Sequence, residues 1–400
     1  MTPEEYSRTF DSRVADVLTA AAERVGPLRD RLAGIGMASS QLRDSHSLGV
    51  VPVLSKDEVI ALQASDPPFG GMLAPQARLR RVFQSPGPIY EPEPDEPDHW
   101  RWAPALQVAG FGPDDLVLNA FGYHLSPAGA MFEEGARAVG CGVVPAGIGN
   151  ADLQAQACVH LGVTAYIGLP SYLKALLEKA EEADLRLMIR KAFVTAEPLP
   201  TSLRAWLQER IPVVHQGYGT AEAGNLGYEC TRMEGLHVPD DALIEIVDLS
   251  TGEPFWDGRV GQVVATVFSE QYPLVRFGTG DLSAYLTEPC GCGLPTPRLK
   301  GWLGRVGEAV KVRGMFLHPR QVEQVMGKVA GIDRYRFVVD RVEHLDGLRC
   351  EVVLSPGSEV DRVFAEIRDQ VRSGLRFNVE VFEVESLDAD MAIDDVRSWE

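Results

Sequence analysis

The sequence has no long apolar run, and it has few cysteines for its length. A membrane-spanning helix needs about 20 consecutive apolar residues, and no run in the chain approaches that length. Residues 1–13 are polar and carry acids, so they lack the basic and apolar regions of a signal peptide. Six cysteines in 400 residues do not suggest a disulfide framework. These absences predict a soluble, cytoplasmic protein without a membrane partner.

Positive charge is also scarce. The 38 Lys and Arg are outnumbered by 57 Asp and Glu, giving a formal net charge of −19, which disfavours binding to nucleic acid. One segment departs from this balance, because residues 297–319 hold a single acid, Glu308, among several cations. Those cations are Arg298, Lys300, Arg305, Lys311 and Arg313. A basic strip in an acidic protein favours a small bound polyanion, although a solvated loop followed by a strand is the alternative.

The apolar pattern predicts an α/β protein of two domains. An apolar content of 45% in 400 residues can bury a substantial core. Between residues 100 and 220, helical stretches alternate with short apolar runs, which predicts a mostly parallel sheet covered by helices. The expected strands lie at 115–119, 142–145, 165–169, 192–195 and 212–215.

The rest of the chain follows other patterns. Strands and turns from 242 predict a small antiparallel, barrel-like subdomain at about 242–303, which completes a large N-terminal domain at 1–305. Residues 306–400 predict a small, mobile α+β domain. Its expected elements are helices near 319–329 and 360–375 and strands at 335–339, 349–354 and 379–384. Residues 2–35 predict an amphipathic helical start, and the Pro- and acid-rich stretch 84–99 predicts a loop.

An Asp on a glycine-flanked turn is the most informative motif. Asp281 ends the string RFGTGD at 276–281, and a Gly-Arg pair follows at Gly304 and Arg305. Such an Asp can accept hydrogen bonds from two neighbouring hydroxyls, as on a ribose, and the guanidinium can reach the same sugar or a phosphate. The pair therefore predicts a nucleotide site.

Further strings occur in a consistent order along residues 40–385. They are FGYHL at 121–125, GVVPAGIGN at 142–150, LPSYL at 169–173, AEP at 196–198, YGTAE at 218–222, EC at 229–230, GLH at 235–237, PLVRFGTGD at 273–281, CGCG at 290–293, PRL at 297–299, GR at 304–305 and VRGMFLHP at 312–319. Together they resemble the adenylate-forming (AMP-binding) superfamily, and most closely its phenylacetate–coenzyme A ligase branch.

The resemblance implies an enzyme that uses ATP to activate an aromatic carboxylic acid as an acyl-adenylate. The C-terminal domain would then rotate, and coenzyme A would attack to form a thioester. The implied nucleotide contacts comprise Ala196, Glu197 and Pro198 at the adenine, Tyr218 stacked on it, Gly219 allowing close approach, and Asp281 with Arg305 at the ribose. Glu222 would bind Mg²⁺, with Thr220 beside it.

Other implied positions concern the acid and the acceptor. Gly307 falls at the hinge between the domains, and Gly314 would admit the pantetheine chain of coenzyme A. Four residues would approach the acid: Tyr123, His124, Ser126 and Tyr172. Ordinary packing is the alternative for Tyr123 and Tyr172. Family members often form dimers, so a homodimer is expected by analogy.

The sequence departs from the family pattern where phosphate is bound. In the phosphate loop only Ser85 and Gly87 persist, and the two prolines at 86 and 88 offer no N–H, while Glu91 and Glu93 would repel a phosphate. The usual catalytic lysine is missing, since residues 385–400 contain Arg397 as their only cation. Loss of one such donor commonly costs about 10²–10³ in rate. Replacement charge could come from Arg276, Arg298 or Lys311.

These departures leave three functions open. The first is the acid–coenzyme A ligase. The second is an adenylate-forming enzyme with another acceptor, such as a nitrogen nucleophile in specialised metabolism. The third is a non-catalytic relative that binds a nucleotide or an aromatic acid. In each case the expected partners are a small-molecule acid and a nucleotide.

Four metal-ligating residues complete the pattern. Cys230, His237, Cys290 and Cys292 offer thiolate and imidazole in the 3:1 ratio of many tetrahedral zinc sites. We expect a structural Zn²⁺ that ties the loop after Glu222 to the loop after Asp281, so that its removal would loosen the nucleotide site. Buried free thiols and a surface histidine are the alternative.

Overall fold

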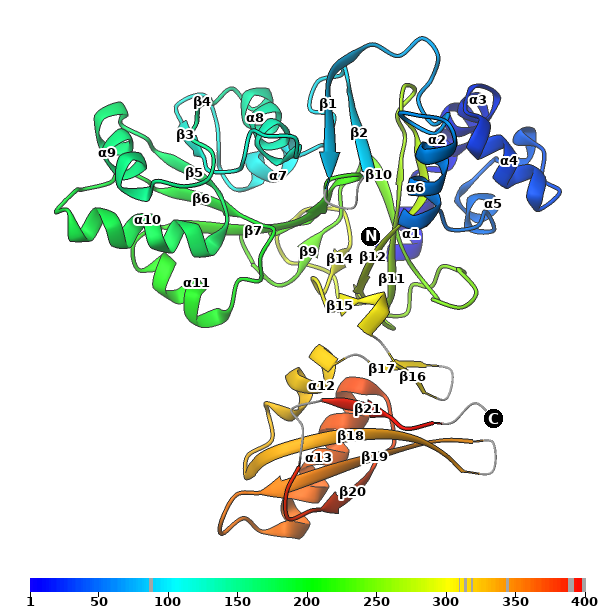
Figure 1. Cartoon of the computed structure of the whole chain (residues 1–400), viewed down its shortest axis with the longest axis vertical. Coiled ribbons are helices and arrows are strands. Elements are labelled where there is room, and N and C mark those ends of the chain that lie inside the picture. The colour runs from blue at the N-terminus through cyan, green and yellow to red at the C-terminus, as the bar shows by residue number, and fades with distance from the viewer. Residues whose placement is uncertain are drawn as a thin grey trace. The chain divides into compact units, whose positions relative to one another are not determined.

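The computed structural model (Figure 1) describes residues 1–85, 89–308, 310–312, 315–317, 319–342, 345–387 and 392–397. The chain divides into two compact units. The first comprises Met1–Thr279 and Ser283–Gly301, and the second comprises Gly280–Leu282 and Trp302–Glu400. Among the described residues, no helix is both long and apolar enough to cross a membrane.

A nine-stranded sheet forms the body of the first unit, in the order β13-β14-β9-β8-β7-β6-β5-β3-β4. The five strands from β7 to β4 are parallel, which confirms the predicted α/β class. They are β3 (Leu116–Asn119), β4 (Gly142–Pro145), β5 (Ala165–Gly168), β6 (Lys191–Val194) and β7 (Val213–Thr220). The helices of this region are α7 (Ala103–Val108), α8 (Ala128–Ala138), α9 (Ala151–Leu161), α10 (Pro170–Glu182) and α11 (Thr201–Gln208).

Both faces of the inner parallel strands β3, β5 and β6 are largely buried. Successive side chains of a strand point to opposite faces, so Val117 packs in one core cluster with Phe132 and Phe193, whereas Leu118 packs in another with Leu176. Burial on two sides explains why these strands read as continuous apolar runs in the sequence.

The sheet becomes antiparallel beyond β7. The strands there are β8 (Gly224–Tyr228), β9 (Leu236–His237), β14 (Arg298–Leu299) and β13 (Tyr285–Leu286). A second antiparallel group contains β10 (Ala242–Val247), β11 (Gly261–Val267) and β12 (Leu274–Ser283), in the region where the barrel-like subdomain is predicted.

Short N-terminal helices pack on this second group rather than forming one long helix. They are α1 (Pro3–Arg8), α2 (Asp11–Arg13), the π-helix η1 (Val14–Leu18), α3 (Thr19–Arg24), α4 (Gly26–Gly34), the 3₁₀ helix η2 (Ser39–Gln41), α5 (Ser45–Gly49) and α6 (Lys56–Ser65). The Tyr6 hydroxyl donates to the Pro239 carbonyl at 2.8 Å, and this contact fixes α1 beside β10.

Arg276 and Arg298 do not supply replacement charge to a phosphate site. The Arg276 side chain is only 1% exposed, and its Nε lies 3.0 Å from Glu245 Oε2. The same guanidinium donates to the carbonyls of Gly49 and Val51 at 2.6 Å. Arg298 is buried and donates to the Glu234 carbonyl and, at 2.9 Å, to the Glu288 carbonyl. The side chain of Lys311 lies outside the described residues.

The prediction of a loop at residues 84–99 is wrong for residues 84–85 and 89–94, which lie in strands. Strands β1 (Leu79–Ser85) and β2 (Ile89–Pro94) pair as a two-stranded antiparallel hairpin. Both strands are edges, where proline is tolerated. The Gln63 side chain of α6 also accepts from the Tyr90 N–H and donates to its carbonyl, both at 2.8 Å. This contact stabilises β2 by a means that the local sequence does not reveal.

The second unit contains a four-stranded sheet in the order β20-β19-β18-β21. Its strands are β18 (Ile332–Val342), β19 (Leu345–Leu354), β20 (Glu380–Glu383) and β21 (Ile393–Asp395), and its helices are α12 (Pro319–Met326) and α13 (Val360–Leu375). The predicted limits of α13 are confirmed. The shorter elements are β15 (Gly304–Arg305), the 3₁₀ helix η3 (Val306–Glu308), β16 (Val310–Val312) and β17 (Met315–Leu317). Val363, Ile367 and Val371 recur at helical spacing and are buried, as expected for an amphipathic helix covering a sheet.

Candidate functional site

The site residues of the first unit gather where β6 and β7 end. In a parallel sheet, ligands bind in the crevice outside the carboxyl ends of the strands. Thr195 follows β6, and its hydroxyl donates to the Gly217 carbonyl of β7 at 2.8 Å. This hydrogen bond brings the predicted adenine segment 196–198 beside the segment 218–222. Ala196 has a left-handed backbone with φ of 67°.

Contacts with other residues of the chain fix the position of both segments. The Ser171 N–H donates to Glu197 Oε2 at 3.4 Å, across the start of α10. A Cβ at Gly219 would lie 2.3 Å from the Gly224 carbonyl oxygen and 2.7 Å from the Trp102 ring. Glycine at 219 is therefore required by packing within the protein, independently of any nucleotide. The roles of Ala196, Glu197, Pro198, Tyr218 and Gly219 toward a nucleotide stay predictions.

Two hydrogen bonds fix the turn after β7. Thr220 Oγ1 accepts from the Ala223 N–H at 3.1 Å, and Trp100 Nε1 donates to the Ala221 carbonyl at 3.1 Å. These contacts fix the backbone on both sides of Glu222. In this structure the Thr220 hydroxyl shapes the turn, and its predicted catalytic role stays a prediction.

Glu222 lies in a buried cluster of charged groups. Its side chain is 7% exposed, and its Oε1 lies 2.9 Å from Lys56 Nζ at the start of α6. Glu91 on β2 is also buried, and the Ser85 hydroxyl donates to Glu91 Oε1 at 3.2 Å. Burial, and then the charge of Glu222, raise the pKa of Glu91 to about 8. Ser85, Glu91, Lys56 and Glu222 thus form one site, which we call the carboxylate cluster.

Sequence reasoning missed two members of this cluster. It treated Glu91 only as a residue that would repel a phosphate, and it did not single out Lys56. The local signal at Lys56 is a helix start, because Ser55 and Glu58 form a capping box around it. Nothing local indicates a pairing with a residue so distant in the chain. Gly87, the other predicted phosphate-loop residue, lies outside the described residues.

The predicted acid pocket is only partly assembled. Tyr123 and His124 line an open cavity of about 380 Å³ together with Arg81, Val82, Phe83, Ala130 and Glu133. The Tyr123 hydroxyl accepts from Asn119 Nδ2 at 2.7 Å, and burial raises the pKa of Tyr123 above its ordinary value. Ser126 and Tyr172 do not line this cavity. The Tyr172 hydroxyl instead donates to the Gly149 carbonyl at 3.0 Å.

Asp281 and Arg305 face each other in the second unit. They are register partners on β12 and β15, and Arg305 Nε lies 3.9 Å from Asp281 Oδ1. Trp302 Nε1 donates to the same oxygen at 3.0 Å, and the Arg305 side chain is 74% exposed. The structure brings this predicted pair together, and its assignment to a ribose stays a prediction.

The remaining predicted positions have mixed outcomes. Gly307 lies in η3, and a Cβ there would meet no atom within 4 Å among the described residues, so space does not require glycine. Gly314 lies outside the described residues. In the C-terminal segment, Arg397 Nη2 lies 2.7 Å from Asp395 Oδ2.

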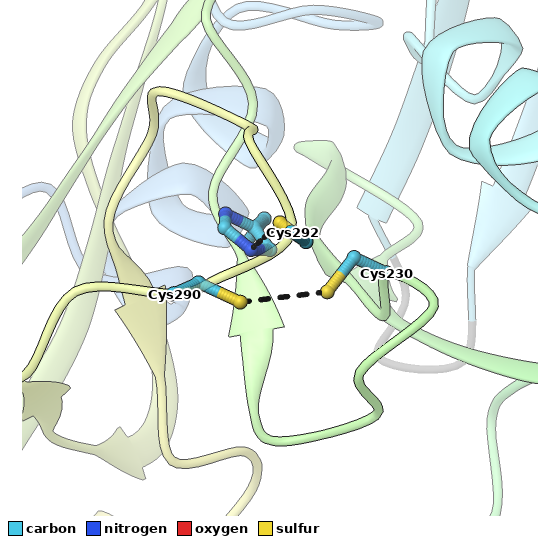
Figure 2. Close-up of side chains that lie close together, drawn as sticks. Cys230, Cys290 and Cys292 are labelled. Carbon is cyan, nitrogen blue, oxygen red and sulfur yellow. Dashed lines mark hydrogen bonds between the residues drawn. The ribbon is translucent and has the colours of Figure 1, made fainter.

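The four predicted metal ligands come together in the first unit (Figure 2). The potential ligand atoms of Cys230, His237, Cys290 and Cys292 all lie within 4.8 Å of one another. Burial lowers the pKa of His237, which favours the neutral imidazole.

Comparison with known proteins finds relatives along most of the chain. The sequence profile described as AMP-binding enzyme matches residues 103–266. The chain is 29% identical, over 389 residues, to the phenylacetate–coenzyme A ligase of Thermus thermophilus, covering 93% of this chain and 85% of the relative. It is 26% identical to the phenylacetate–coenzyme A ligase of Escherichia coli, covering 89% and 84% of the two chains.

Solved structures extend the likeness to the fold. An open conformation of 2-hydroxyisobutyryl-CoA ligase, in complex with 2-HIB-AMP and CoA, matches with a TM-score of 0.86 and 21% identity. The match covers 99% of this chain and 92% of that structure. The chain is therefore similar to phenylacetate–coenzyme A ligases over most of its length, and its residues 103–266 match the AMP-binding enzyme family.

Proposed function

We propose that this protein uses ATP to activate a carboxylic acid as an acyl-adenylate and transfers the acyl group to coenzyme A. The observation that carries the proposal is the length of chain over which the sequence matches known ligases. The phenylacetate–coenzyme A ligase of Thermus thermophilus matches across 93% of the chain, so the match takes in both units. A protein that had kept only a nucleotide-binding body would not need the second unit.

The first unit would bind the adenine and the metal. Residues 196–198 and Tyr218 would enclose the adenine at the carboxyl ends of β6 and β7. The Glu222 carboxylate is a hard oxygen ligand that suits Mg²⁺, which usually takes one or two carboxylates together with phosphate oxygens. Lys56 balances the charge of Glu222 in the structure, and a bound cation would supply that charge instead. Mg²⁺ would stabilise the negative charge of the phosphates during adenylation.

Protonation of Glu91 would reduce the repulsion of a bound phosphate. With a pKa of about 8, its carboxyl is mainly protonated at neutral pH, so it adds little negative charge next to a phosphate. A protonated carboxyl can also donate a hydrogen bond. The phosphate side of the site is thus less repulsive than a count of its acids suggests.

The acid is proposed to be aromatic because the named relatives act on phenylacetate. The cavity lined by Phe83, Tyr123 and His124 offers aromatic side chains that could pack against such an acid. A homodimer, by analogy with family members, and a cytoplasmic location belong to the same proposal.

Product analysis tests the proposed function. The protein would be incubated with ATP, Mg²⁺, coenzyme A and a panel of aromatic and short hydroxy acids, and the products would be identified by mass spectrometry. We expect AMP and one acyl-coenzyme A thioester, formed only with the matching acid. AMP with an amide in place of the thioester, when amines replace coenzyme A, would move the proposal to a nitrogen acceptor.

A second function is favoured by one sequence feature. Residues 385–400 contain no lysine, and family members use a lysine there at the reacting phosphate. A protein that binds ATP without turning it over would lack that residue without penalty. Calorimetry showing tight ATP binding, together with no AMP formation on any acid, would support this second function over the first.

A further inference from the structure

A cluster of sulfur and nitrogen atoms lies at the antiparallel half of the nine-stranded sheet. Figure 2 shows Cys230, Cys290 and Cys292 turned toward a common centre. The fourth member, His237, is fully buried on β9. We propose that these four side chains bind one structural Zn²⁺.

The distances between the ligand atoms match a tetrahedral zinc site. Zn–S bonds of about 2.3 Å and Zn–N bonds of about 2.0–2.1 Å place two sulfurs about 3.8 Å apart, and a sulfur and a nitrogen about 3.6 Å apart. Cys230 Sγ lies 3.7 Å from Cys290 Sγ, and Cys292 Sγ lies 3.3 Å from His237 Nε2. A disulfide would need its sulfurs at about 2.05 Å. The four atoms are therefore spaced to surround an ion.

The histidine is held in the form that a metal requires. His237 Nδ1 lies 2.7 Å from the Thr296 carbonyl oxygen, which can only accept, so Nδ1 carries the proton. The lone pair of Nε2 then points toward the cluster. Such a hydrogen bond from the far ring nitrogen is the usual outer contact of a zinc-bound histidine.

Backbone N–H groups support two of the sulfurs. The Arg232 N–H donates to Cys230 Sγ, and the Leu294 N–H donates to Cys292 Sγ, both at 3.4 Å. Each donor stands two residues after its cysteine, so each sulfur is the centre of a tight turn. Gly293 has φ of 92°, a conformation that glycine adopts readily, and it allows the second turn to close. These donors partly offset the negative charge of thiolates.

The ligand set identifies the metal and its role. Three soft thiolates and one imidazole select Zn²⁺ over Mg²⁺, Ca²⁺ or Mn²⁺. Four protein ligands complete a tetrahedron and leave no position for a substrate, so the site is structural rather than catalytic.

The ion would join three segments on neighbouring strands. Cys230 follows β8, His237 lies in β9, and the Cys290–Cys292 turn precedes β14, and these three strands are adjacent in the sheet. β8 begins two residues after Glu222. Zinc binding would therefore stabilise the antiparallel half of the sheet next to the turn that carries Glu222. Its binding free energy would contribute directly to folding.

Metal analysis of the purified protein tests this proposal. Protein prepared under reducing conditions should contain about one Zn²⁺ per chain by plasma mass spectrometry. Replacement by Co²⁺ should give the visible absorption of a tetrahedral thiolate site. Neither measurement depends on substrate turnover, so failure of the zinc site and failure of the proposed function can be told apart.

Matched variants sharpen the test. Cys292→Ser should lower the zinc content well below one per chain, whereas Cys158→Ala, which removes a buried thiol outside the cluster, should keep it. If Cys292→Ser fails to fold, the zinc content and cobalt spectrum of the wild-type protein still decide. A correctly folded wild-type protein that contains almost no zinc, and shows no cobalt–thiolate absorption, would overturn the proposal.

Discussion

The two segments that the resemblance assigns to ATP have different structures. The adenine side, residues 196–198 and 218–222, keeps the family strings and sits on the buried strands β6 and β7. The phosphate side, residues 83–92, has lost most of its family pattern, and its described residues lie on the paired strands β1 and β2, of which β2 carries the buried acid Glu91. We propose from this difference that the nucleoside contacts and the phosphate contacts of this family can diverge separately. Four predictions test how far that separation goes.

The largest expected effect is at Glu222. Glu222→Gln keeps the size of the side chain but removes the charge that would hold Mg²⁺, so we expect adenylation to fall by about 10²–10³. The measurement is the initial rate of AMP formation at saturating ATP and acid. Glu23→Gln, on an exposed position of α3, is the matched control and should keep the wild-type rate. Equal rates for both variants would show that the Glu222 carboxylate does not take part in adenylation.

Substitutions at Tyr218 and Ser85 compare the adenine side with the phosphate side directly. Tyr218→Ala removes the ring proposed to stack on adenine, and should weaken ATP binding by about tenfold, since stacking on a base is worth about 1–3 kcal/mol. Tyr218→Phe keeps the ring and should bind like the wild type. Ser85→Ala should change ATP affinity less than twofold, because its hydroxyl is used by Glu91. Calorimetry checks all three, and an equal loss in Ser85→Ala and Tyr218→Ala would break the comparison.

The pKa of Glu91 predicts a pH dependence of stability. The folded pKa of about 8 is above the ordinary value of 4.5, so the native state binds more protons than the unfolded state between these values. Stability contributed at Glu91 is therefore present at low pH and is lost as the pH rises through 8, by at most about 1.4 kcal/mol per pH unit. Glu91→Gln should flatten the decline in melting temperature between about pH 5 and 8. An unchanged pH profile in this variant would contradict the raised pKa.

A small effect on stability is expected at Lys56. The side chain of Lys56 is 41% exposed, whereas that of Glu222 is 7% exposed. Because solvent screens the pair, its contribution to the free energy of unfolding is small. Lys56→Met should lower the free energy of unfolding by about 1 kcal/mol. Chemical denaturation with urea measures this, with Lys328→Met, at an exposed position after α12, as the control. A gain in stability would show that the ion pair is not what balances Glu222.

Periodic elements could be predicted from the sequence because their signal is local. The apolar spacing of α13 predicted its limits, and short apolar runs predicted β3 to β7, of which β3, β5 and β6 are largely buried on both faces. The four proposed zinc ligands could be singled out for a different reason. Cysteine is rare in this chain, so a Cys-x-Cys pair with a further Cys and His stands out against the background.

The missed features depend on contacts between distant residues. Prolines at 92 and 94 argued against a strand, yet the side chain of Gln63 stabilises the backbone of β2 at Tyr90. The pairing of Lys56 with Glu222 joins the start of α6 to the end of β7. The sequence offers Arg276 as available charge, whereas its buried side chain is paired with Glu245 and three backbone carbonyls. In each case the partner lies far away in the chain, and no local pattern points to it.

The exchange of radiolabelled pyrophosphate into ATP tests the central claim most directly, because it detects adenylation whatever the final acceptor is. With Mg²⁺ and a panel of carboxylic acids, we predict exchange that depends on one class of acid and is abolished in Glu222→Gln. Exchange that stays at background for every acid, in protein shown by calorimetry to be folded, would contradict the assignment of this chain as an acid-activating enzyme.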